Sequence, residues 1–214
     1  MRLALLLFLS IYPIIGTIFF IKMSRQKLPY PVFLCAAACG VLSTVFAALL
    51  QGMLDPPEFS NRIAILYYIF VRISFSEEIM RVVVLFPFFM LYKKIFKSEL
   101  TKPFAVICGL CSGLAFASVE TALIAATNPT FILIRLITAA PLHGACGVRC
   151  AAAAFSKPFG SKNIRYFAGA LILHAFYDAM LISGNRLFIA IAVMLTIAVL
   201  IRSVREGIRE NINE

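Results

Sequence analysis

The sequence predicts an all-α fold: a polytopic helical membrane protein with about seven transmembrane helices around a polar intramembrane site. The composition supports this prediction, because 62% of the 214 residues are hydrophobic and only 14% are charged. Soluble domains carry about a quarter charged residues. Several apolar runs also approach or exceed the ~20 residues that cross a bilayer as a helix. A small group of ionisable residues inside these runs predicts the polar site.

Hydropathy places the first three expected spans in the N-terminal half. The first run is longer than the apolar core of a signal peptide and lacks an A-x-A-like cleavage site, so we expect an uncleaved helix. The basic loop KMSRQKLP leads to the second span, and DPPEFSNR separates the second from the third. The third run, residues 63–92, would be roughly 45 Å long against about 30 Å of hydrocarbon. It is therefore either one tilted helix or a helix that breaks near Ser74–Ser76.

Four further apolar runs complete the expected bundle. They are joined by the short loops KKIFKSELTKP, TNPT, SKPFGSKN and SGNR, which leave no room for an appended soluble module. The chain shows no internal repeat. We therefore expect a single integral membrane domain over residues 1–214, whose motif-bearing core is about 63–183. The seven expected spans are 3–21, 30–54, 63–92, 105–126, 131–154, 167–183 and 187–201.

The net charge of +10 is explained by where the basic residues lie. If the chain crosses seven times, most Lys and Arg residues fall on one side, while Arg2, Arg62 and Arg186 lie on the other. The positive-inside rule then predicts an outside N-terminus and a cytoplasmic C-terminus. This distribution indicates topology and contact with the lipid bilayer, and it is poor evidence for nucleic-acid binding.

The six cysteines form three close pairs inside apolar segments. One pair matches C-x-x-C, but no βαβ pattern surrounds it, so the redox interpretation is weak. Cysteine is small and tolerates apolar surroundings, which makes packing at helix contacts the better interpretation. The pairs are Cys35/Cys39, Cys108/Cys111 and Cys146/Cys150.

Ionisable side chains inside the apolar runs are the observation that points to function. One charge at the centre of a membrane helix costs roughly 2.5–3.5 kcal/mol, so four acids and an arginine would together cost about 10 kcal/mol or more. We therefore expect these side chains to face one another in a protein-lined, wet cavity. Both histidines of the chain lie in the same runs. The members of this predicted cluster are Glu77, Glu78, Arg81, Glu120, His143, His174 and Asp178.

Helical spacing predicts which of these side chains can meet. His174 and Asp178 are four residues apart and share one helix face. Arg81 lies four residues after Glu77 and three after Glu78, so it can reach either carboxylate. The two glutamates point about 100° apart around the helix, so one can hold Arg81 while the other faces the cavity. From the i,i+4 spacing we expect Glu77 to pair with Arg81 and Glu78 to act as a base.

A cluster of this composition suits hydrolysis by an activated water. A carboxylate in a low-dielectric cavity can serve as a general base, and a histidine can donate to a developing oxyanion. Two histidines with carboxylates could instead hold a metal that activates water. The sequence has no H-E-x-x-H zinc motif, no P-loop, and no Ser–His or Cys–His pair with clear spacing.

Two other functions are compatible with the same residues. A proton- or metal-coupled transporter could use the cluster as a relay, although the chain lacks the repeated halves that many transporters show. A structural membrane subunit could use it only to lock its helices together. The residues alone leave these alternatives open beside hydrolysis.

The cluster residues lie in four short motifs, each on its own expected span, across about residues 63–183. The motifs are Glu77-Glu78-x-x-Arg81, Phe116-Ala117-x-x-Glu120, His143-x-x-x-Gly147 and His174-Ala175-x-x-Asp178. In this order they resemble the motifs of the PrsW family of intramembrane proteases, which is related to the CAAX prenyl protease and bacteriocin-processing superfamily. The family often has Lys where this chain has Arg81.

The resemblance implies an intramembrane peptidase whose substrate is a membrane-anchored protein, similar to an anti-sigma factor. It implies that Glu77 and Glu78 supply the water-activating base. His143 and His174 would polarise the carbonyl or ligate a metal. The implied supporting residues are Arg81, Glu120, which completes the cluster, and Asp178, which orients His174.

The resemblance also bears on cofactor and location. If the enzyme depends on a metal, His143, His174 and Asp178 are the expected ligands, and Zn²⁺ is the candidate ion. A mechanism that uses glutamate alone stays open beside the metal-dependent one. The resemblance further implies the bacterial cytoplasmic membrane, with the topology that the positive-inside rule predicts.

Overall fold

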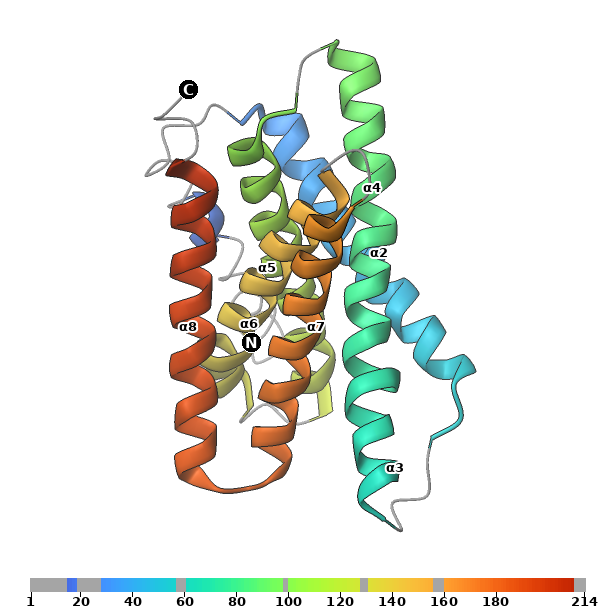
Figure 1. Ribbon diagram of the computed structural model, residues 1–214, viewed down its shortest axis with the longest axis vertical. Helices are drawn as coiled ribbons and strands as arrows, with labels where there is room; N and C mark the ends of the chain where they lie inside the picture. Colours follow the sequence, from blue (N-terminus) through green and yellow to red (C-terminus); the bar gives the residue numbers. More distant parts are fainter. Residues whose placement is uncertain are drawn as a thin grey trace.

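The computed structural model describes residues 15–18, 28–56, 61–97, 100–127, 131–155 and 160–209, and these contain helices and no strands (Figure 1). The fold is therefore all-α, as predicted. Short connections separate its long helices. The elements are α2 (Tyr30–Met53), α3 (Arg62–Tyr67), the π-helix η1 (Tyr68–Phe75), α4 (Ser76–Phe96), α5 (Lys102–Thr127), α6 (Phe131–Phe155), α7 (Ser161–Ile182) and α8 (Arg186–Arg209).

The predicted spans from residue 30 onward each coincide with observed helices. The first predicted span, 3–21, lies outside the described residues except for the helical residues 15–18. Three helical segments are long and apolar enough to cross a membrane by length and composition: α2, residues 102–124 of α5, and residues 186–206 of α8. These segments and the all-α fold identify a polytopic helical membrane protein. The predicted direction of the crossings stays a prediction.

The long third span is one continuous helical rod rather than a broken helix (Figure 1). Its α-helical ends flank the π-helix η1, and the joining residues Tyr68 and Ser76 both have right-handed helical φ/ψ angles. Arg72 Nε, within η1, donates to the Leu54 carbonyl oxygen at the end of α2, 3.1 Å away. The π-helix ends immediately before Ser76 and the double glutamate. Insertions of this kind are frequent beside functional sites.

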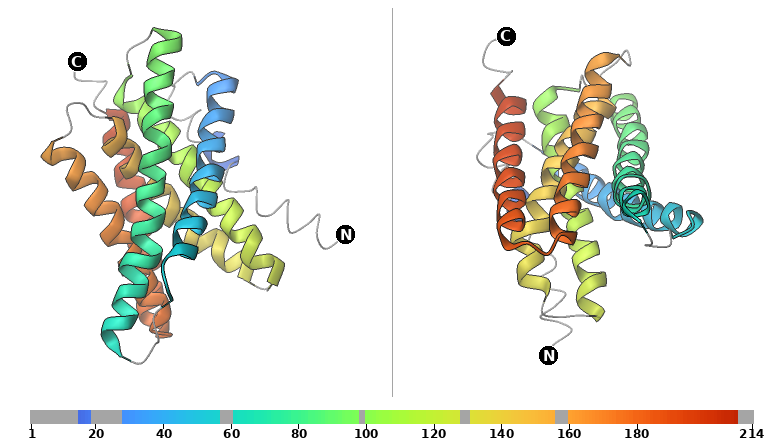
Figure 2. Two further views of the ribbon diagram at one scale, coloured as in Figure 1. Left: turned by 90° about the vertical axis from the view of Figure 1, so that its right-hand side faces the viewer. Right: turned by 60° about the horizontal axis from the view of Figure 1, so that its bottom comes forward.

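Helix α6 is the centre of the bundle. It packs against α4, α5, α7 and α8, whereas α2 packs on α4 and α5. Figure 2 shows α2 crossing the other helices obliquely. A side chain in the middle of α6 is therefore surrounded by protein, which positions His143 among residues from neighbouring helices.

Glycines bring α5 and α6 unusually close together. A Cβ atom at Gly113 would collide with the backbone carbonyl oxygen of His143, and one at Gly147 would collide with the carbonyl oxygen of Gly109. Small residues allow membrane helices to approach in this way. The contact at Gly147 is thus a close approach of the α5 and α6 backbones. It places the α5 residue Glu120 beside the α6 residue His143.

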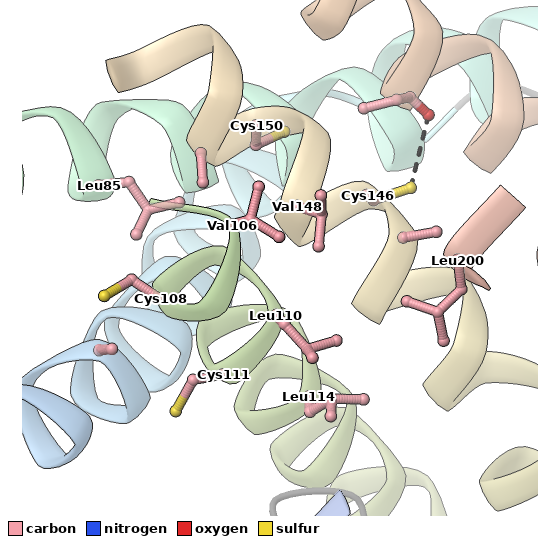
Figure 3. Close-up of a cluster of buried hydrophobic side chains, with 14 of the residues drawn as sticks. Leu85, Val106, Cys108, Leu110, Cys111, Leu114, Cys146, Val148, Cys150 and Leu200 are labelled. Carbon is pink, nitrogen blue, oxygen red and sulfur yellow. Dashed lines mark hydrogen bonds between the residues drawn. The ribbon is translucent and has the colours of Figure 1, made fainter. Parts of the chain in front are cut away.

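The cysteines contribute to the packed interior, as predicted. All six are free thiols, and all except Cys35 are buried. Figure 3 shows Cys108 and Cys111 on α5 and Cys146 and Cys150 on α6 among buried leucine and valine side chains. The Cys146 thiol donates to the Ala170 carbonyl oxygen at 3.6 Å, which links α6 to α7.

Replacement of Gly113 by valine is expected to lower the free energy of unfolding by about 1–3 kcal/mol, because the added carbons must push α5 away from α6. Gly52→Val is the matched control, since a Cβ atom at Gly52 meets no atom within 4 Å. Unfolding in detergent micelles, followed by circular dichroism, measures both variants. Equal destabilisation would show that the α5–α6 contact does not limit stability.

Candidate active site

Seven ionisable side chains from four helices meet inside the bundle. Glu78 and Arg81 have no exposed surface, and His143 and His174 are each 2% exposed. The rings of the two histidines lie edge to face, with their centroids 5.3 Å apart. The structure thus brings together all the residues of the predicted cluster. Helix α4 contributes Glu77, Glu78 and Arg81, α5 contributes Glu120, α6 contributes His143, and α7 contributes His174 and Asp178.

Glu78 is held by partners on three helices. Its Oε2 atom accepts from Arg81 Nη1 at 2.5 Å and from the Cys150 thiol at 3.1 Å. Its Oε1 atom lies 2.7 Å from His174 Nδ1. An ionised carboxylate only accepts hydrogen bonds, so Nδ1 is the donor in this contact. The Glu78 carboxylate therefore fixes the orientation of His174.

Arg81 connects Glu78 to the second histidine, His143. Its Nη2 atom lies 3.2 Å from His143 Nδ1, and the other ring nitrogen, Nε2, lies 2.7 Å from Glu120 Oε2. Because arginine only donates hydrogen bonds, Nδ1 accepts and the proton of the neutral ring sits on Nε2. Glu120 also pairs with Arg135 at 2.5 Å. The Arg81 guanidinium stacks over the Phe116 ring, 4.4 Å from its centroid.

The pairing of Arg81 predicted from spacing is wrong. The i,i+4 spacing favours Glu77, whereas Arg81 binds Glu78, three residues before it. Both spacings allow contact on a helix, so the surrounding helices decide. Glu78 points to where α6 and α7 supply two more donors, Cys150 and His174. A carboxylate there is surrounded by partners, and Arg81 completes the set.

Glu77 is left with one oxygen that has no partner. Its Oε1 atom accepts from Gln51 Nε2 of α2 at 3.2 Å. Its Oε2 atom is buried, has no hydrogen-bond partner among the described residues, and lies 3.8 Å from His174 Nε2. Asp178 Oδ2 is likewise buried and unpartnered, 3.5 Å from the same nitrogen. Buried polar atoms without partners are uncommon, and two beside one imidazole mark a place for water, substrate or metal.

A comparison with protein-family models supports the resemblance that the motifs indicate. The model described as PrsW family intramembrane metalloprotease matches residues 28–203, most of the chain. The chain belongs to the PrsW family. It is therefore an intramembrane peptidase, embedded in lipid, that acts on membrane proteins. No curated protein and no solved structure matches it.

A PrsW metalloprotease implies a metal, and the donor atoms of this site fit one. Ligand atoms of Glu77, His143 and His174 are buried and lie within 4.8 Å of one another. Carboxylate oxygen and imidazole nitrogen are the donors that Zn²⁺ accepts in catalytic sites. The unpartnered Glu77 Oε2 atom is available without breaking a contact, whereas both ring nitrogens of His143 already have a partner, so an ion would displace one of them.

This group of close donors differs in a single member from the predicted metal ligands His143, His174 and Asp178. Asp178 is not part of a group of three close donors among the described residues, and Glu77 stands in its place. The prediction that Asp178 orients His174 is also revised, since Glu78 at 2.7 Å is the nearer partner. Glu78, Cys146 and His174 form a second close group, but the Glu78 oxygens already have three donors.

Three residues of the PrsW site were not among the predicted members. Gln51 binds Glu77, Cys150 binds Glu78, and Arg135 binds Glu120. Arg135 could have been found from sequence, because it is a charged residue just inside an apolar run. Gln51 and Cys150 carry weaker signals, since neutral side chains of modest polarity are common in membrane helices.

Proposed function

We propose that this PrsW protein hydrolyses a peptide bond in a membrane-anchored protein, with Glu77 as the residue that activates water. The observation that carries the proposal is the buried Glu77 Oε2 atom, which lacks a partner and lies 3.8 Å from His174 Nε2. The alternative base, Glu78, has both oxygens occupied. A base needs a free acceptor within reach of the proton that it removes, and Glu77 meets this condition.

In the proposed reaction, Glu77 Oε2 accepts a proton from water as the water oxygen attacks the scissile carbonyl carbon. His174 presents Nε2 to the same space, and with a proton there it donates to the oxyanion of the tetrahedral intermediate. Glu77 then returns its proton to the leaving amine, and the C–N bond breaks. A divalent cation such as Zn²⁺, held by Glu77, His143 and His174, would supply Lewis acidity to the water and the carbonyl as an alternative to this proton transfer. The Glu77 and His174 atoms that hold the ion would then not also serve as base and proton donor.

The remaining members of the network act as positioning residues. Glu78 holds the His174 ring through Nδ1, and Gln51 holds the other Glu77 oxygen. Arg81 joins Glu78 to His143. Such support keeps reacting groups within a fraction of an ångström of a productive geometry. We further propose, from the family resemblance, a substrate like an anti-sigma factor in the bacterial cytoplasmic membrane.

His174→Ala is expected to lower cleavage about 10²-fold or more, because it removes the side chain facing Glu77. Newly formed protein N-termini are mapped in membranes of bacterial cells that express the wild type or the variant. His174→Asn, whose amide nitrogen takes the place of Nδ1 and can still donate to Glu78, tests whether the loss comes from misfolding. Elemental analysis of the purified protein and cleavage with a chelator present determine whether a metal takes part. Cleavage that survives in both variants contradicts the proposal, and substrate-dependent ion flux in proteoliposomes would favour a transporter.

A further inference from the structure

We propose a second site that takes no part in hydrolysis. It is a pocket that binds the phosphate of an anionic phospholipid headgroup. The pocket has a volume of about 330 Å³ and lies between α5, α6, α7 and α8. Figure 1 shows the start of α5 and the end of α8 at the same upper end of the bundle. The lining residues that matter here are Lys102, Arg149, Tyr166, Arg202, Ser203 and Glu206.

The charge of the pocket favours an anion. Lys102, Arg149 and Arg202 come from three different helices, against a single carboxylate, Glu206. That carboxylate accepts from Arg202 Nε at 2.6 Å at the exposed rim. The hydroxyl groups of Tyr166 and Ser203 add possible donors. A cationic pocket between membrane helices matches the recognition of anionic lipid headgroups.

Arg149 distinguishes this pocket from a group of unrelated surface charges, because the fold holds its side chain in place. Its Nε atom is buried and has no hydrogen-bond partner among the described residues. Its guanidinium lies directly over Gly169 of α7, where even a Cβ atom would collide with Nη1. The absence of a side chain at Gly169 thus gives the guanidinium its place. Arginine binds phosphate oxygens through two parallel hydrogen bonds.

The apolar part of the lining favours a lipid as the source of the phosphate. Val199, which is half-buried, lines the pocket together with the inner residues Val106 and Val148, both labelled in Figure 3. A free phosphate ion gains nothing from such surface, whereas the glycerol and first acyl carbons of a phospholipid do. By the positive-inside prediction, this end of the bundle faces the cytoplasmic leaflet, where anionic lipids attract basic residues.

The test measures phosphatidylglycerol binding to the full-length, detergent-solubilised protein by native mass spectrometry. The double variant Arg149→Gln/Arg202→Gln is expected to bind about tenfold more weakly or worse, because two charge-assisted contacts are lost. Arg165→Gln is the matched control, because Arg165 is an exposed arginine on α7 that does not line the pocket. Gly169→Ala is expected to weaken binding as well, since it displaces the Arg149 guanidinium while keeping its charge.

Loss of binding in the double variant and in Gly169→Ala, with binding kept in Arg165→Gln, supports the site. Unchanged binding in the double variant, or equal loss in Arg165→Gln, overturns it. A competition arm adds millimolar inorganic phosphate, which is expected to displace the lipid poorly. Displacement at concentrations equal to those of the lipid would show that free phosphate is the ligand and overturn the lipid assignment. Thermal unfolding of each variant reports whether it is folded.

Discussion

Glu77→Gln is expected to reduce peptide hydrolysis about 10³-fold or more, the largest effect on activity in this protein. The substitution removes the carboxylate whose buried Oε2 atom lacks a partner and faces His174 Nε2 at 3.8 Å. A carboxamide cannot take a proton from water at neutral pH, and loss of a general base alone costs about 10²–10⁴-fold. Single-turnover cleavage of a tagged single-span substrate identified in cells, reconstituted in liposomes, measures the rate.

The fold should survive this change, which makes the result interpretable. Glutamine has nearly the same size, and its amide oxygen can still accept the hydrogen bond from Gln51 Nε2. Asp55→Asn is the control, because it makes the same kind of change at an exposed residue after α2. If the Glu77→Gln enzyme keeps about a tenth of the wild-type rate, another acidic residue acts as the base. Asp178 is then the first candidate, since its Oδ2 atom is also unpartnered.

The helices and the residues that form the site could be predicted from the sequence. Both are determined by large free-energy costs of placing polar groups in lipid. An apolar run long enough to cross a bilayer can satisfy its backbone only as a helix in lipid. A charged residue within it costs several kcal/mol unless it finds partners. Glu120 on α5 and His143 on α6 illustrate this: the sequence separates them widely, yet they lie 2.7 Å apart.

The details that escaped prediction depend on differences of less than a kcal/mol. Contacts of Arg81 with residues three or four positions away are about equally favourable on an isolated helix. The choice of Glu78 over Glu77 comes from Cys150 and His174 on other helices, which the local sequence does not place. The π-helix before Ser76 was not predicted either. The excess length of residues 63–92 allowed a break near Ser74–Ser76, but nothing in the apolar run indicates π-helical hydrogen bonding.

Removal of the Arg81 guanidinium is expected to be the most destabilising single change in the site. Arg81→Met leaves Glu78 as a buried charge without its cation, and breaking a buried ion pair in this way costs about 3–5 kcal/mol. Both side chains have no exposed surface, so water does not compensate the loss. The variant also loses the bond to His143 Nδ1. Equilibrium unfolding in mixed micelles measures the free energy of unfolding.

The double variant Arg81→Met/Glu78→Gln separates the cost of the unpaired charge from the value of the pair. It is expected to be more stable than Arg81→Met alone, because the neutral amide no longer needs a cation and can still accept from His174. Arg81→Lys keeps the charge without the planar fork, so it should retain most of the stability while losing the contact with His143. If the effects of Arg81→Met and Glu78→Gln simply add, the two residues are not energetically coupled. The network would then stabilise the fold through its other contacts.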